Sequence, residues 1–243
     1  MTRQIGLLFT PENRALVRAG LKTETRRAQG LGFTDDHAVE WRPCSELPAD
    51  NPGHVRLESA AGEFRDVRSP YGLPQQQPVN YYLKEPVKVK WISFDPDSDG
   101  LFQAGITYVD TGESAIASIT DADRTKLLNR KDWQTPSSSM FMLKSFARCW
   151  LPGEKVWVER LGDMTPESAI AEGIELNPDF AMNANQFAQI NGWQGPHWRD
   201  YINGGYDLSP VQSYATLWTA INSSDPWHPD RLVWAIRYAP PRV

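Results

Sequence analysis

The chain has 243 residues, which is enough for one large domain or two small ones. Its formal net charge of −5 argues against a protein that coats nucleic acid non-specifically, because that role needs a large positive field. No apolar run approaches the length of about twenty residues that a membrane span requires, and the N-terminal apolar stretch is too short for a secretory signal. We therefore expect a cytoplasmic protein without a membrane partner.

The cysteines and histidines show no metal-ligand spacing. Cys44 and Cys149 are isolated from each other in the sequence, and the four histidines are scattered. The sequence therefore predicts no metal site and no cofactor. Reduced thiols are expected in the cytoplasm, with a Cys44–Cys149 bridge as the open alternative.

The N-terminal segment predicts a strand followed by a capped helix. Residues 5–9 form a short apolar run, which is typical of a buried strand. Thr10 can cap a helix over 11–19, and Pro11 suits the first turn of that helix. Gly20 can then take the left-handed conformation that ends a helix and turns the chain.

The middle of the chain predicts mainly strands. Residues 28–68 show little periodicity, and we expect an irregular excursion with one short strand near 54–58. Proline and glutamine crowd residues 70–78 and mark a loop. The strand candidates that follow are 81–85, 87–94, 101–109 and 114–119.

The last part of the chain predicts three helices and three further strands. Residues 121–129 form a short helix with Leu127 and Leu128 inward, and strands are expected at 140–150, 155–161 and 232–238. Thr165 and Pro166 begin a helix that Gly173 ends. Ser209-Pro210 begin another. Its predicted inward residues are Val211, Tyr214, Trp218 and Ile221. Three tryptophans are expected in the core, namely Trp157, Trp218 and Trp234.

The segment richest in reactive and ligand-binding side chains is Gly20-Leu21-Lys22-Thr23-Glu24-Thr25-Arg26-Arg27. It holds one amine, two hydroxyls and two guanidinium groups directly after a predicted helix. Residues 1–30 carry six basic residues against two acidic ones, which favours a local basic patch for a small or single-stranded ligand. The alternative interpretation is a solvated surface turn, because such side chains are mostly exposed.

Several segments, in order along the chain, resemble the ASCH family, which is related to the PUA domains of RNA-binding proteins. The first is Ile5 to Thr10, a helix, and then the pattern Gly20-x-Lys22-Thr23-x-Thr25-x-Arg27. The chain most resembles the long ASCH proteins of bacteriophages and prophages. The other matching segments are Ser69 to Pro74, Tyr82 to Glu85, Trp133 to Ser137 with Met140, Val156 to Gly173, Leu217 to Trp227 and Val233 to Ile236.

This resemblance implies an α+β fold with a PUA-like mixed β-barrel and flanking helices. It implies a single domain over residues 1–243, with long insertions at about 28–68 and 177–205. The chain departs from the family in two ways. It is more than twice as long as a minimal ASCH enzyme, and the spacer between Trp227 and Val233 has no clear match.

The resemblance also implies a site. In the bacterial ASCH enzyme that deacetylates N4-acetylcytidine, the matching pattern supplies a catalytic lysine and threonine, which here are Lys22 and Thr25. Glu172, on the later helix, takes the place of the family's glutamate. Thr23, Arg26 and Arg27 are the implied nucleoside- or nucleic-acid-binding residues. The alternative for Glu172 is a surface position near a helix end.

We therefore expect a protein that binds RNA or a modified nucleoside and acts as an amidohydrolase on an N-acyl cytidine. Three alternatives stay open: a non-catalytic module for RNA or single-stranded nucleic acid, a ribonuclease, and a phage accessory protein that binds a host protein through 28–68. A group of aromatic residues could stack on bases or hold a polar loop together. Its members are Trp193, Trp198, Tyr201 and Tyr206.

Overall fold

The computed structural model describes residues 2–32, 40–44, 47–48, 50–95, 100–178 and 196–241. Contacts divide the chain into two compact units. The first comprises residues 1–3, 19–79 and 153–240, and the second comprises residues 4–18, 80–152 and 241–243. Each unit is described by itself below.

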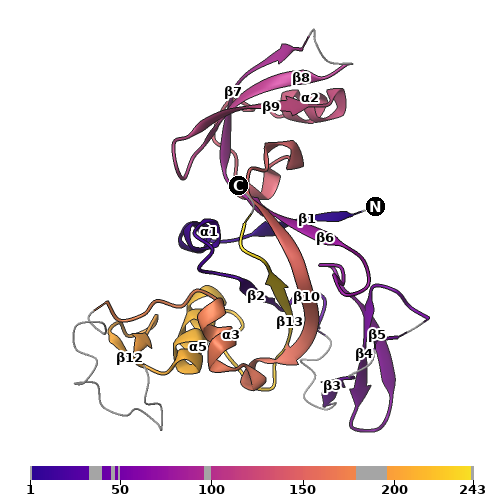
Figure 1. The fold of residues 1–243 in the computed structure, drawn as a ribbon, viewed down its shortest axis with the longest axis vertical. Coiled ribbons are helices and arrows are strands. Elements are labelled where there is room, and N and C mark those ends of the chain that lie inside the picture. Colours follow the sequence, from indigo (N-terminus) through magenta and orange to yellow (C-terminus); the bar gives the residue numbers. More distant parts are fainter. Residues whose placement is uncertain are drawn as a thin grey trace. The chain divides into compact units, whose positions relative to one another are not determined.

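The first unit is built on three antiparallel strands. The long strand β10 pairs with β13 from Gly153 onward, and β13 pairs on its other side with β2. The strands can be followed in Figure 1. They are β2 (Glu24–Arg27), β10 (Trp150–Arg160) and β13 (Leu232–Tyr238). β13 is almost wholly buried, as its continuous apolar sequence predicts for a central strand.

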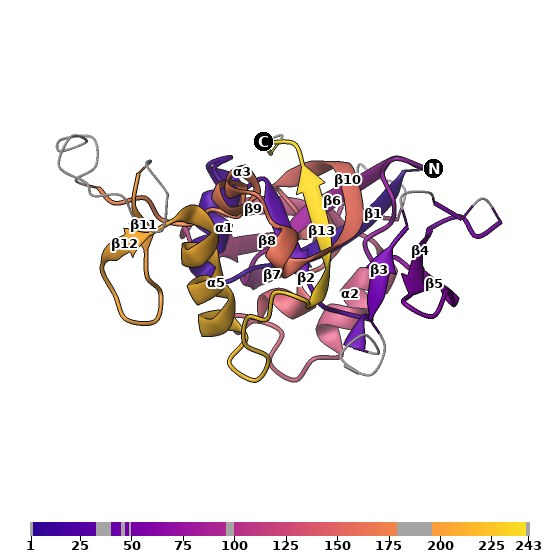
Figure 2. The same ribbon diagram turned by 90° about the horizontal axis from the view of Figure 1, so that it is seen from below.

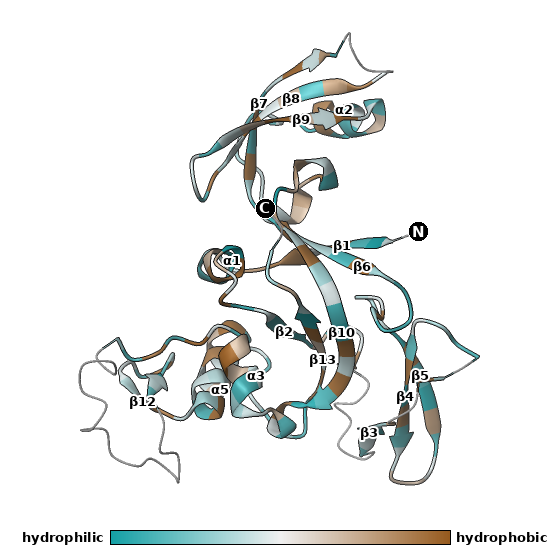
Figure 3. Ribbon diagram, viewed as in Figure 1, coloured by the Kyte–Doolittle hydropathy of each residue, from teal (hydrophilic) through white to brown (hydrophobic). Residues whose placement is uncertain are grey.

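Two helices pack against each other in the first unit. They are α3 (Pro166–Ala171) and α5 (Pro210–Ile221), and both carry hydrophobic segments in Figure 3. Thr165 caps α3, and Ser209 forms a capping box with Gln212 at the start of α5. Both helix starts are confirmed. The core beside them includes Leu161, Met164, Ala169, Ile174, Trp198, Tyr214, Trp218 and Val233.

The first unit also contains two smaller sheets. Residues 28–68, expected to be irregular with one strand, contain a three-stranded antiparallel sheet of β3 (Trp41–Pro43), β4 (His54–Ser59) and β5 (Phe64–Arg68). The strand expected near 54–58 is confirmed as β4, whereas β3 and β5 were not predicted, because neither contains a fully buried residue that would mark it as a strand. The other sheet pairs β11 (Trp198–Arg199) with β12 (Tyr206–Leu208). Figure 2 shows these strands from below.

The second unit begins with α1 (Pro11–Arg18) and with β1 (Arg3–Leu8) from its second residue onward. β1 pairs with β6 (Val79–Lys84), which pairs with the first residues of β10. The Thr10 side chain accepts a hydrogen bond from the Asn13 N–H at 3.3 Å, and Gly20, which follows the helix, has φ of 71°. The predicted cap and turn are thus confirmed. β1 is only partly buried, because it lies at the edge of its sheet.

The rest of the second unit is a twisted three-stranded sheet with short helices beside it. Its core includes Val89, Ile106 and Phe146. The elements are β7 (Val87–Phe94), β8 (Phe102–Tyr108), β9 (Ser114–Ile119), α2 (Asp121–Leu128), and the 3₁₀ turns η2 (Ser139–Phe141) and η3 (Lys144–Phe146). The four strands predicted between 81 and 119 are confirmed.

Four side-chain or boundary predictions were wrong. The expected strand at 140–150 is replaced by the turns η2 and η3. A short segment in which apolar and polar residues alternate is compatible with a strand and with tight turns, so its pattern alone does not decide between them. Leu128 and Ile221, which were expected to face inward, are exposed. Each is the last residue of its helix, where no neighbouring element covers the side chain. Trp157 is half-buried rather than in the core, because it alternates along β10 with the buried Val156 and Val158 and so lies on the opposite face of the strand.

The chain is therefore α+β, as predicted. Within the described residues, the strand pairings do not close any sheet into a barrel. Both cysteines are free thiols, as expected. Among the described helices, none combines the length and the apolarity that crossing a membrane requires.

Candidate functional site

The end of α3 meets the start of β2 in the first unit, and this junction brings Lys22 to Glu172. Gly173 has φ of 81°, which ends α3, and Glu172 is the C-cap residue. The Thr23 N–H donates to the Ala171 carbonyl at 2.9 Å, and the Lys22 amine donates to the Glu172 carbonyl at 2.5 Å. The Lys22 segment thus satisfies carbonyls that a helix end leaves open.

The same amine also contacts the Glu172 side chain. Lys22 Nζ donates a hydrogen bond to Glu172 Oε2, although the two residues are 150 positions apart in the sequence. Each residue is only 2% exposed. The expected juxtaposition of this lysine and this glutamate is therefore confirmed, and the alternative of a surface glutamate is excluded.

Arg26 connects this pair to two further carboxylates. Its Nη1 lies 3.3 Å from Glu172 Oε1 and 3.1 Å from Glu24 Oε2. Its Nε donates to Glu159 Oε1 at 2.8 Å, and Nη2 lies 2.7 Å from the same oxygen without hydrogen-bond geometry. Arg26 is thus fixed by carboxylates rather than displayed toward solvent.

Tyr214, on α5, completes the contacts of Glu172. Its hydroxyl donates to Glu172 Oε1 at 3.0 Å, and its ring lies 6.0 Å from the guanidinium carbon of Arg26. Burial and the neighbouring Glu172 carboxylate raise the pKa of Tyr214 well above its ordinary value, so the phenol stays protonated and donates. We call the following residues the buried cluster: Lys22, Glu24, Arg26, Glu159, Glu172 and Tyr214.

The environment lowers the pKa of both members of the Lys22–Glu172 pair. Burial lowers the pKa of Lys22, and the Glu172 carboxylate opposes this shift only in part. For Glu172, burial acts to raise the pKa, but the positive charges of Lys22 and Arg26 outweigh it. Burial likewise acts to lower the pKa of Arg26, yet Glu172 and Glu159 raise it overall. Glu172 is therefore held as a carboxylate, and Lys22 gives up its proton more readily than an exposed lysine.

Thr25 and Arg27 occupy the other side of β2. Side chains alternate along a strand, so Thr25 and Arg27 point away from the side that carries Glu24 and Arg26. Thr25 is buried and pairs with Ile236, and no hydrogen bond joins its hydroxyl to the described residues of the buried cluster. Arg27 is half-buried, and its charge contributes to the lowered pKa of Lys22. Of the predicted residues, Lys22, Glu172 and Arg26 meet directly, while Thr23 participates through its backbone.

Sequence reasoning missed three members of the buried cluster. Glu24 and Glu159 lie on strands. A charged side chain that faces inward from a strand needs a partner of opposite charge, and the local sequence pattern does not show which distant residue that partner is. Tyr214 was placed on the inward face of its helix, and the need of a buried tyrosine hydroxyl for an acceptor was the available signal.

The aromatic residues of the later insertion hold their own segment together. Trp198 is buried in the core beside α3 and α5, and Tyr201 and Tyr206 contact Glu175 through their hydroxyls. These contacts favour the stapling interpretation over base stacking. Trp193 lies outside the described residues.

Comparison with protein-family models, with curated proteins and with solved structures finds no match to this chain. In the described part of the chain, histidine, cysteine, aspartate and glutamate side chains form no group that could hold a metal ion.

Proposed function

We propose that this chain is an ASCH-fold protein that binds RNA or a modified nucleoside and removes an N-acyl group from cytidine. The observation that carries this proposal is the direct contact between the Lys22 amine and the Glu172 carboxylate, 150 positions apart. The proposed fold includes the family's PUA-like barrel, for which β2, β10 and β13 would supply one wall.

The chemistry of amide hydrolysis matches these two groups. Water attacks the acyl carbon, the bond from that carbon to the exocyclic nitrogen of cytosine breaks, and the products are a carboxylate and cytidine. Glu172 is held ionised and can accept a proton from water, either directly or through Lys22. A protonated Lys22 can stabilise the oxyanion and then give its proton to the leaving nitrogen.

Arg26 and Tyr214 have positioning roles in this proposal. Both contact Glu172 Oε1, whereas Lys22 contacts Glu172 Oε2. One oxygen of the carboxylate is thus fixed by the cluster, and the other faces the amine. Thr25 would have to approach the pair from the other side of β2, so we assign the attack to water.

A second candidate is a non-catalytic module for RNA or single-stranded nucleic acid. It is favoured by the burial of Lys22 and Glu172, each 2% exposed, because a substrate must separate β2 from α3 to reach them. In this case the half-buried Arg27, one of the predicted binding residues, is a cation on β2 that an RNA phosphate can contact. Binding should then weaken with salt and in Arg27→Ala, without any turnover.

The test is hydrolysis of N4-acetylcytidine, offered as the nucleoside and within a short RNA. We expect cytidine to be released by the wild type, and Glu172→Gln and Lys22→Met to lose about 100-fold or more in rate. Glu167→Gln on the same helix and the exposed Lys155→Met are matched controls and should keep the wild-type rate. Retention of RNA without product would favour the second candidate. Strand cleavage that survives metal chelation and is lost in Lys22→Met would instead indicate a ribonuclease.

A further inference from the structure

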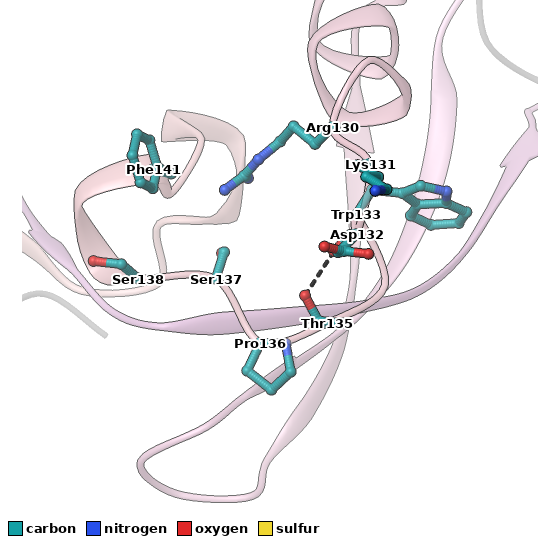
Figure 4. A pocket seen from close by; sticks show the side chains of 9 residues that line it. All are labelled: Arg130, Lys131, Asp132, Trp133, Thr135, Pro136, Ser137, Ser138 and Phe141. Carbon is teal, nitrogen blue, oxygen red and sulfur yellow. Dashed lines mark hydrogen bonds between the residues drawn. The ribbon is translucent and has the colours of Figure 1, made fainter.

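The second unit contains an open cavity that is separate from the buried cluster. It has a volume of about 310 Å³, at the lower end of the range of about 300–1,000 Å³ found for small-molecule sites. The chain segment after α2 and the turn η2 form its walls (Figure 4). The lining residues are Arg130, Lys131, Asp132, Trp133, Thr135, Pro136, Ser137, Ser138 and Phe141.

Two cations line this cavity against one carboxylate. Arg130 is half-buried and Lys131 is exposed, and neither forms an ion pair with any described residue. Arg130 extends across the cavity toward Phe141, while Lys131 and Asp132 lie on the other side (Figure 4). The lining therefore has a net positive charge that the described residues do not neutralise.

Phe141 holds the guanidinium and also offers an exposed ring. The guanidinium carbon of Arg130 lies 5.1 Å from the ring centroid, within the range of a cation–π contact. Phe141 is 58% exposed, so much of its surface remains open to a ligand. A guanidinium plane and an aromatic ring together provide surfaces on which a planar base can stack.

The hydroxyl groups that line the cavity differ in whether their protons are already used in hydrogen bonds within the protein. Ser137 donates to the Val87 carbonyl and Thr135 donates to the Asp132 carbonyl. Ser138, in contrast, accepts a hydrogen bond from the Met140 N–H, so its own proton remains for an acceptor on a ligand. Trp133 packs against the core of the unit and supports the cavity from behind.

We propose that this cavity binds a nucleotide, with its phosphate at Arg130 and Lys131 and its base against Phe141. Phosphate is an anion with oxygen acceptors, which guanidinium and ammonium groups recognise. The exposed ring distinguishes a nucleotide from phosphate alone. This site lies in a different unit from the buried cluster, so the inference does not rest on the hydrolase proposal.

The test is calorimetric titration of the full chain at low salt with adenosine 5′-monophosphate, adenosine and inorganic phosphate. The adenine probe avoids the cytidine site proposed above. We expect saturable binding of the nucleotide, with adenosine and phosphate each binding at least about 10-fold more weakly, a difference of about 1.4 kcal/mol.

Arg130→Gln should weaken nucleotide binding about 10-fold or more, and Phe141→Leu should weaken it while sparing phosphate. Arg124→Gln is the matched control, because Arg124 lies on α2, pairs with Asp121 and does not line the cavity. Absence of saturable binding, equal affinity for nucleotide and phosphate, or wild-type affinity in Arg130→Gln would each overturn the proposal.

Discussion

The buried cluster and the Arg130 cavity treat positive charge in opposite ways. In the buried cluster, Lys22 and Arg26 are surrounded by the carboxylates of Glu24, Glu159 and Glu172. In the cavity, Arg130 rests on an aromatic ring without a carboxylate partner in the described part of the chain. A cation that the fold neutralises contributes to stability and to proton transfer within the fold. A cation left to the solvent is available to an external anion.

This comparison predicts the largest effect for Lys22→Met. The substitution leaves the Glu172 carboxylate buried without its nearest counter-charge, and we expect the free energy of unfolding to fall by about 3–5 kcal/mol. Urea unfolding measures it, and the exposed Lys155→Met should change stability by less than about 0.5 kcal/mol. A loss in Lys22→Met as small as in the control would contradict the paired state.

The double variant Lys22→Met with Glu172→Met sharpens this result. Removing both charges abolishes the need to bury an unpaired carboxylate, so the double variant should be more stable than Lys22→Met alone. Additive losses would mean that the two side chains do not interact.

Acid should weaken the buried cluster through Glu172. The pKa of Glu172 is lower in the folded protein than its ordinary value of 4.5, so the unfolded chain binds the proton more tightly. The contribution of Glu172 is therefore fully present above about pH 4.5 and is lost as the pH falls through the folded-state pKa. The wild type should lose more stability than Glu172→Gln over this range. The measurement is urea unfolding of both proteins at successive pH values. Equal losses of unfolding free energy in the wild type and in Glu172→Gln would contradict the lowered pKa of Glu172.

Tyr214→Phe should have a smaller effect. It removes the hydroxyl that donates to Glu172 at 3.0 Å, and we expect a loss of about 1–2 kcal/mol. Tyr206→Phe is the matched control, because it breaks a tyrosine–glutamate contact at the surface, where solvent replaces the hydrogen bond. Equal losses in the two variants would show that burial does not strengthen the Tyr214 contact.

Arg130→Gln should have the smallest effect on stability. Because this cation forms no ion pair with the described residues, its loss should change the unfolding free energy by less than about 0.5–1 kcal/mol, the value of one cation–π contact. Its effect should appear in nucleotide binding instead. A large loss of stability would mean that Arg130 is a structural residue like Arg26.

Local signals in the sequence predicted much of the fold. Thr10, Thr165 and Ser209 cap the three helices that begin after them, and Gly20 and Gly173 turn the chain where those signals placed them. Caps and left-handed glycines depend on neighbouring residues alone, which is why they can be read without a structure. Within 28–68, the expected strand near 54–58 is β4, whereas β3 and β5 were missed because they contain no fully buried residue.

The site was predictable only where a family pattern supplied long-range information. The resemblance pointed to Lys22 and Glu172, and the structure brings them together. The partners of Arg26 arise from strand register between β2, β13 and β10, which local periodicity does not encode. The alternation along β2 likewise places Thr25 away from Glu172, although the same pattern had grouped them.

The most direct measurement of the central claim is the rate at which Glu172→Gln and Glu167→Gln release cytidine from N4-acetylcytidine, each compared with the wild type. If the Lys22–Glu172 pair performs the hydrolysis, Glu172→Gln should lose about 100-fold or more while Glu167→Gln keeps the wild-type rate. Equal rates in the two variants, or no cytidine released by the wild type from either the nucleoside or the RNA, would contradict the account.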